Sequence, residues 1–103
     1  MSTVNQPHVL VVDDNLTNLA FISALLQEED YHVTLAKSGE KALNLAKESP
    51  PDIILLDITM DGWDGYETCQ HLKKVPILNK TLMTRNDLLR NRFLVIKSAL
   101  LSL

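Results

Sequence analysis

The sequence has almost no cysteine and no long apolar run, the features of disulfide-rich and of membrane-spanning proteins. Its 103 residues include one cysteine, three glycines and one tryptophan, and only 5% are aromatic. The single thiol, Cys69, excludes an internal disulfide and has no second thiol with which to share a metal ion. No apolar run approaches the roughly 18 to 20 residues of a membrane span, and residues 1–8 lack a secretion signal. We therefore expect a cytoplasmic protein with no membrane partner.

Acidic residues are scarce in one part of the chain, its last third. Residues 1–72 hold 12 acidic and 3 basic residues, whereas residues 73–103 hold 1 acidic and 7 basic ones. Such an abrupt reversal can mark a segment that faces nucleic acid or a membrane, or a segment of separate origin. We therefore divide the single expected domain into a tail over 1–7, a regular part over 8–73 and an atypical basic, apolar segment over 74–103.

Two short apolar runs that end in carboxylates are the most informative feature present. Val9–Val12 is followed by Asp13 and Asp14, and Ile53–Leu56 is followed by Asp57. Short runs that are apolar on every side and rich in β-branched residues are typical of strands buried in a parallel sheet. Such strands carry ligand sites at their carboxyl ends, so the three acids are expected around one crevice. An all-oxygen set of this kind suits Mg²⁺, or alternatively Mn²⁺.

Strands alternate with helices through the regular part of the chain. This order predicts an α/β fold, a doubly wound parallel sheet covered on both faces by right-handed crossovers. The expected elements are a strand over 8–12, a helix over about 17–29, a strand over 31–36, a helix ending before Pro50, a strand over 53–57 and a helix over 65–73.

The residues of these units resemble a known family. The stretch Val9–Leu72 is similar to the response-regulator receiver domains of two-component signalling. The acidic pair Asp13 and Asp14, the strand ending in Asp57 and the loop Met60–Gly65 carry the resemblance. It implies a flavodoxin-like fold, which the atypical last third leaves incomplete at the C-terminus.

The resemblance also implies a site and an activity. Asp57 would accept a phosphoryl group from a sensor histidine kinase or a histidine phosphotransfer domain. The domain is not expected to be an enzyme, and at most it would catalyse this transfer to itself. Asp13, Asp14, one oxygen of Asp57 and the backbone carbonyl of Thr59 would hold the Mg²⁺ ion. A simpler role for Asp13 or Asp14 is to cap the next helix, which stabilises by about 1 kcal/mol. A cap needs only one acid.

Two departures from the family pattern concern residues around the phosphoacceptor. Asp61 stands where the family commonly has proline, which we expect to loosen the loop and to add a negative charge. The family also has a threonine or serine and a lysine that bind the phosphoryl oxygens and relay the switch. Thr81 and Lys97 are the candidates here, although Ser98 stands where the family has proline after the lysine.

Three interpretations of the C-terminal segment compete. In the first, a strand over 75–78 is followed by an amphipathic helix from about Arg85 and the fifth strand is missing. Apolar residues at helical spacing support that helix: Leu89, Phe93, Ile96, Leu100 and Leu103. In the second, residues 93–96 form the fifth strand, and Thr81 and Lys97 keep the family roles. In the third, the segment is unrelated to the fold, as a reading-frame shift would produce.

Other functions are weighed against the receiver interpretation. A phosphatase of the haloacid dehalogenase type needs an aspartate two residues after its nucleophile, where this chain has Thr59. Nucleic-acid binding through the basic tail is not expected, because no helix-turn-helix pattern accompanies Arg85, Arg90, Arg92 and Lys97. A degenerate interaction module that does not signal is the closer alternative. An open sheet edge or the C-terminal helix would then favour self-association.

Overall fold

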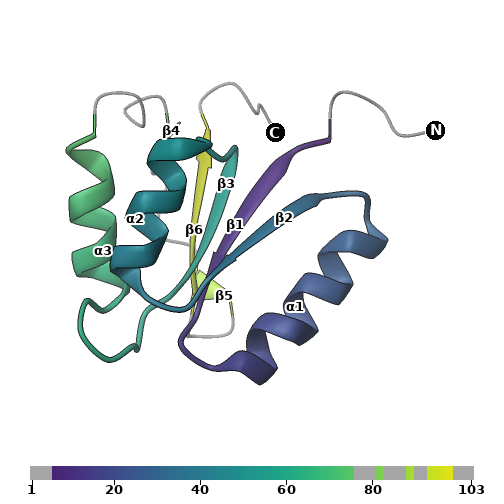
Figure 1. The fold of residues 1–103 in the computed structure, drawn as a ribbon, viewed down its shortest axis with the longest axis horizontal. Coiled ribbons are helices and arrows are strands. Elements are labelled where there is room, and N and C mark those ends of the chain that lie inside the picture. The colour runs from purple at the N-terminus through teal and green to yellow at the C-terminus, as the bar shows by residue number, and fades with distance from the viewer. Residues whose placement is uncertain (1–5, 76–80, 83–87, 90–92, 99–103) are drawn as a thin grey trace.

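Three βα units followed by three C-terminal strands make up the described part of the protein (Figure 1). A computed structural model describes residues 6–75, 81–82, 88–89 and 93–98, with side chains over 6–75. The elements are β1 (His8–Val12), α1 (Leu16–Glu28), β2 (His32–Ala36), α2 (Gly39–Glu48), β3 (Ile53–Asp57), α3 (Gly65–Lys73), β4 (Thr81–Leu82), β5 (Leu88–Leu89) and β6 (Phe93–Ser98).

The first three strands form the parallel centre of the sheet. They lie in the order β2-β1-β3, with Val12 opposite Ala36 on one side and Leu56 on the other. Helix α1 lies on one face of these strands, and α2 and α3 lie together on the other (Figure 1). The predicted α/β doubly wound fold is therefore confirmed for the regular part of the chain.

Alternating side chains divide the core between the two faces of the sheet. Leu10 and Leu56 belong to the cluster under α2 and α3, whereas Val9 and Val11 pack with Leu19 of α1. Each of these five residues is at most 3% exposed. Burial of one such side chain stabilises the fold by roughly 1.5 to 3 kcal/mol, so the three strands are fixed by the core on both sides.

The helices begin at polar residues that cap them. Asn15, Ser38 and Asp64 each accept, through a side-chain oxygen, a hydrogen bond from the backbone N–H three residues later, at 3.0, 3.1 and 2.8 Å. A cap of this kind stabilises by about 1 kcal/mol. Asn15 and Asp64 are important for the site, because they end the loops that follow β1 and β3 and so limit where those loops run.

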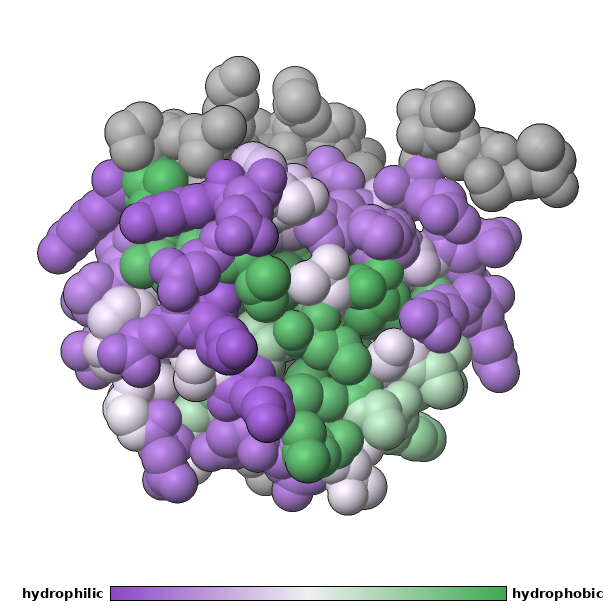
Figure 2. Space-filling model, viewed as in Figure 1, coloured by the Kyte–Doolittle hydropathy of each residue, from purple (hydrophilic) through white to green (hydrophobic). Residues whose placement is uncertain are grey.

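The outer side of α1 carries exposed apolar residues. Phe21 is 65% exposed and Leu25 is 48% exposed. Leu35, on the outer strand β2, is 40% exposed. Figure 2 shows apolar surface between α1 and α2, over β2. Leu25 therefore points away from the core. Within the described residues, α1, α2 and α3 include no helix long and apolar enough to cross a membrane.

The C-terminal strands correct two predictions about the last third of the chain. An amphipathic helix from about Arg85 is not found, because Leu88–Leu89 and Phe93–Ser98 are strands. The strand expected over 75–78 is not found at Val75, which lies in a bend, and 76–78 fall outside the described residues. Strand β6 pairs antiparallel with β3, and β4 and β5 pair with opposite ends of β6. The sheet is therefore mixed, and β6 occupies the edge of β3.

A histidine pair lies at the amino ends of the parallel strands. The rings of His8 and His32 are 4.8 Å apart, and Nε2 of His8 lies 2.7 Å from the Thr34 hydroxyl. The backbone N–H of His8 donates to Asp52 at 2.8 Å. Burial lowers the pKa of His8 below 6.5, and the neighbouring His32 lowers it further, although the Pro50 carbonyl and Asp52 oppose them. His8 is therefore held preferentially in its neutral form.

Stability is expected to fall as the pH drops below 6.5, because His8 binds a proton more readily in the unfolded chain than in the fold. The contribution is fully present above pH 6.5 and is lost as the pH falls toward the folded-state pKa. Urea denaturation at several pH values between about 7.5 and 5 measures it. The His8→Gln variant should show a shallower fall over this range, and parallel curves for both proteins would contradict the prediction.

Candidate functional site

Three carboxylates meet at the carboxyl ends of β1 and β3. These strands are parallel neighbours, so the residues that follow them lie at the same edge of the sheet. Asp13, Asp14 and Asp57 each place a carboxylate oxygen within 4.8 Å of the other two. Asp13 and Asp57 are fully buried, whereas Asp14 is exposed. The arrangement expected from the strand ends is therefore present, with an open side at Asp14.

Hydrogen bonds hold Asp13 from two directions. Its Oδ1 accepts from the backbone N–H of Asn15 at 3.0 Å, and its Oδ2 accepts from Nδ2 of Asn18 at 3.1 Å. Its own N–H donates to the Ala36 carbonyl, which joins the end of β1 to the end of β2. The role of Asn18 was not predicted from the sequence. Its signal would have been an amide side chain in the first turn of the helix that follows an acidic strand end.

Burial raises the pKa of Asp13 above its ordinary value, and both the hydrogen bond to Asp57 and the charge of Asp57 raise it further. The bonds from Asn15 and Asn18 oppose this shift. A raised pKa means that the ionised form destabilises the fold, so stability is lost as the pH rises through the folded-state pKa. Two buried carboxylates this close therefore favour a positive charge between them.

Asp57 is positioned by the loop that follows it. The backbone N–H of Thr59 donates to Oδ1 of Asp57 at 3.0 Å, and the N–H of Gly65 closes the loop by donating to the Ile58 carbonyl at 2.9 Å. Gly65 begins α3 directly against this turn. A Cβ atom there would lie 2.7 Å from the carbonyl oxygen of Asp57, so the close approach requires glycine.

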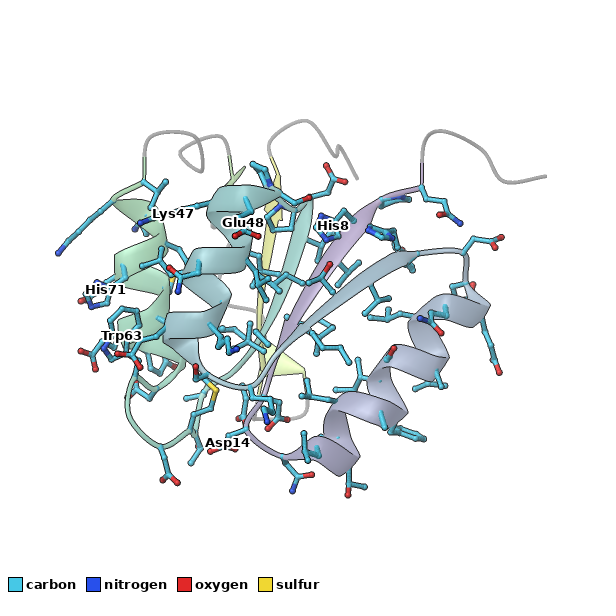
Figure 3. All side chains as sticks on the ribbon, in the orientation of Figure 1. His8, Asp14, Lys47, Glu48, Trp63 and His71 are labelled. Carbon is cyan, nitrogen blue, oxygen red and sulfur yellow. The ribbon has the colours of Figure 1, made fainter. Side chains whose placement is uncertain are left out.

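Asp14 lies at the lower end of the sheet in Figure 3, with His8 at the opposite end. Its Oδ2 accepts a hydrogen bond from the backbone N–H of Asp61 at 3.2 Å. This bond joins the loop after β1 to the loop after β3. Trp63, two residues further along, stacks on His71 of α3 with ring centroids 3.8 Å apart and an interplanar angle of 5° (Figure 3). The loop after β3 therefore has contacts on both of its sides.

The two switch candidates lie away from these carboxylates. Because β6 runs antiparallel to β3, Lys97 is paired with Ile53, while Phe93 is paired with Asp57. Ile53 lies four positions before Asp57, or about 13 Å along the strand. Thr81 pairs with Ser98, one residue further from the site. The expectation that Lys97 and Thr81 stand beside Asp57 is therefore not met, and the direction of β6 is the reason.

The chemistry of the donor set fits a hard divalent cation. Asp13, Asp14 and Asp57 offer oxygen atoms only, and Mg²⁺ is commonly bound by one or two carboxylates with water completing its shell. The exposed side at Asp14 leaves room for such water. Nitrogen or sulfur ligands, which zinc prefers, are not among these three residues. The residues present are therefore suited to Mg²⁺ or Mn²⁺ more than to zinc.

The fold and the site together define a class of protein. It is a doubly wound α/β domain with a cluster of carboxylates at the carboxyl ends of its parallel strands. Within that class, the family model described as "Response regulator receiver domain" matches residues 9–96. The chain belongs to the response regulator receiver domain family.

Curated proteins and solved structures agree with this assignment. The chain is 42% identical over 73 residues to "Signal transduction histidine-protein kinase BarA" of Escherichia coli K12, covering 71% of this chain and 8% of that protein. It is 46% identical over 68 residues to "Response regulator PleD" of Caulobacter vibrioides, covering 66% of this chain and 15% of that protein. The chain thus spans a small part of each relative.

Among solved structures, the chemotaxis protein CheY4 of Vibrio cholerae superposes with a TM-score of 0.71 at 28% identity. That comparison covers 73% of this chain and 62% of the other. The N-terminal domain of a response regulator receiver protein from Methanoculleus marisnigri gives a TM-score of 0.67 at 36% identity, covering 70% and 58%. In each case about a quarter to a third of this chain falls outside the match.

Proposed function

We propose that Asp57 accepts a phosphoryl group in a phosphorelay, while Asp13, Asp14, Asp57 and the backbone carbonyl of Thr59 hold Mg²⁺, or Mn²⁺ in its place. The observation that carries this proposal is the cluster of three carboxylates within 4.8 Å at the shared end of β1 and β3. Membership of the receiver family supports it, because receiver domains bind Mg²⁺ at such an acidic cluster.

The transfer is a displacement at phosphorus. A carboxylate oxygen of Asp57 attacks the phosphorus of a phosphohistidine, the phosphorus–nitrogen bond breaks, and an acyl phosphate forms on Asp57. The Thr59 N–H fixes one oxygen of the Asp57 carboxylate by donating to Oδ1. Asp13 and Asp14 would bind the cation. When bound, Mg²⁺ supplies positive charge against the negative charge spread over the transferring group.

The donor that we propose is a sensor histidine kinase or a histidine phosphotransfer domain. The names of the relatives support it, since one is a signal transduction histidine-protein kinase and another a response regulator. We place the domain in the cytoplasm and assign it no enzymatic activity on a separate substrate. A second copy of the chain is a further partner, because β2 is an outer strand of the sheet and outer strands are able to pair with another chain.

Signalling output is expected to be weaker than phosphate acceptance. The groups that would report the phosphate, Thr81 and Lys97, are placed by strand register at the other end of β3 from Asp57. Acceptance depends on β1, β3 and their loops, all within the regular part of the chain. A domain that accepts phosphate without a large change of surface would therefore act as a phosphate sink or an interaction module.

Incubation with a small phosphodonor and Mg²⁺ tests the proposal. Intact-mass spectrometry is expected to show one added phosphoryl group, which hydroxylamine removes because it cleaves acyl phosphates. Omitting Mg²⁺ and adding EDTA should reduce incorporation strongly, since the charge that stabilises the transferring group is then absent. Phosphate that resists hydroxylamine, or equal incorporation in EDTA, would contradict the proposal.

A further inference from the structure

We propose that Asp61 is a positioning residue for the metal site, acting through its backbone N–H on the carboxylate of Asp14. The inference rests on the proposed function, because it concerns the same cation. The bond from Asp61 to Oδ2 of Asp14 measures 3.2 Å and joins residues that are 47 positions apart in the chain. A backbone donor is thus aimed at an exposed acidic side chain on a different loop.

The loop after β3 is built to present this N–H. It is anchored at its start by the bond from Thr59 to Asp57 and closed at its end by the bond from Gly65 to Ile58. Asp61 lies between these anchors. Gly62, with φ of 73°, adopts the left-handed conformation immediately afterwards, which glycine adopts without strain.

The three carboxylates differ in how much they need such a bond. Asp13 and Asp57 are fully buried and are held by neighbours on their own loops. Asp14 is exposed, so its side chain has rotamers pointing into solvent to choose from. The bond from Asp61 selects an orientation in which Asp14 lies within 4.8 Å of both other carboxylates. The ligand set is therefore assembled before an ion arrives.

The same loop serves two carboxylates through alternate residues. The N–H of Thr59 donates to Asp57 at the end of β3. The N–H of Asp61, two positions later, donates to Asp14, which follows β1. A carboxylate oxygen has lone pairs for a hydrogen bond and a metal ion together. Binding an ion at Asp14 should therefore strengthen the loop contact, and the loop contact should strengthen ion binding by the same factor.

Two variants isolate the N–H from the Asp61 side chain. Asp61→Ala removes the carboxylate and keeps the N–H, whereas Asp61→Pro removes both. Mg²⁺ titrations followed by NMR chemical shifts give each dissociation constant without any phosphodonor. We expect Asp61→Pro to bind Mg²⁺ about three- to tenfold more weakly than Asp61→Ala, as loss of a hydrogen bond to a charged group implies. Equal constants for the two variants would overturn the proposal.

A second measurement needs no metal. In Asp14→Ala the acceptor is gone, so the Asp61 amide should exchange with solvent about five- to tenfold faster than in the parent chain, while the Thr59 amide keeps its rate. Unchanged exchange at Asp61 would also overturn the inference. If both measurements succeed but Asp57 takes up no phosphate, the proposed function fails and the positioning role of Asp61 stands.

Discussion

Asp57→Asn is expected to abolish hydroxylamine-sensitive phosphate incorporation completely. The amide oxygen carries no charge and is a poor nucleophile, so no acyl phosphate can form at this position. The variant should still fold, because an asparagine oxygen can accept the Thr59 N–H in place of Oδ1. Its free energy of unfolding should rise by about 1 kcal/mol, since one of two buried, neighbouring carboxylates loses its charge. Urea denaturation and intact-mass spectrometry measure the two effects.

Asp52→Asn is the matched control for this loss. Asp52 accepts the His8 N–H at 2.8 Å at the opposite edge of the sheet, and asparagine preserves that acceptor. It should take up phosphate like the parent chain. Continued labelling of Asp57→Asn, on Asp13 or elsewhere, would show that the chemistry belongs to another carboxylate.

The regular part of the chain was predictable because its local signals agree. The runs Val9–Val12 and Ile53–Leu56 are apolar on every side, and in the structure both faces of these strands are covered by core clusters. The expected strand over 53–57 is β3, residue for residue, and the helix over 65–73 is α3. Capping side chains and prolines allowed the ends of the other two helices to be predicted to within a few residues.

The C-terminal segment was harder because its pattern fits two structures. Phe93-Leu94-Val95-Ile96 is β-branched and aromatic enough for a strand, yet its apolar residues also fall at helical spacing with their neighbours. In the structure this segment is the strand β6, and its backbone groups pair with those of β3. Local strand propensity does not determine which strand is the partner or whether the pairing is antiparallel. The position of Lys97 could therefore not be predicted.

The site shows the same division between side chains and backbone. Asp13, Asp14 and Asp57 could be placed together from strand ends alone, since parallel neighbours end at one edge. The donors that orient them, Asn18 and the N–H of Asp61, depend on how the following loops run. A backbone N–H has no sequence signature. We predicted that Asp61 loosens the loop because it replaces proline. The prediction did not include the N–H of Asp61, which proline lacks and which donates to Asp14.

Gly65→Ala is expected to lower the free energy of unfolding by about 2 kcal/mol, a large fraction of a small domain's stability. Its Cβ would lie 2.7 Å from both the carbonyl oxygen of Asp57 and the Cα of Ile58, and these are backbone atoms that cannot rotate away. The better helix propensity of alanine, worth about 1 kcal/mol, offsets only part of this overlap. Because the overlap falls on Asp57 itself, Mg²⁺ binding should weaken together with stability.

Gly62→Ala separates this effect from a general intolerance of the loop. A Cβ at Gly62 meets open space, and the cost there is the positive φ of 73°, roughly 1 kcal/mol for a non-glycine residue. Gly62→Ala should therefore lose about half as much stability as Gly65→Ala in urea denaturation. If Gly65→Ala matches the parent chain in both stability and Mg²⁺ affinity, the close approach of α3 to β3 does not constrain the site.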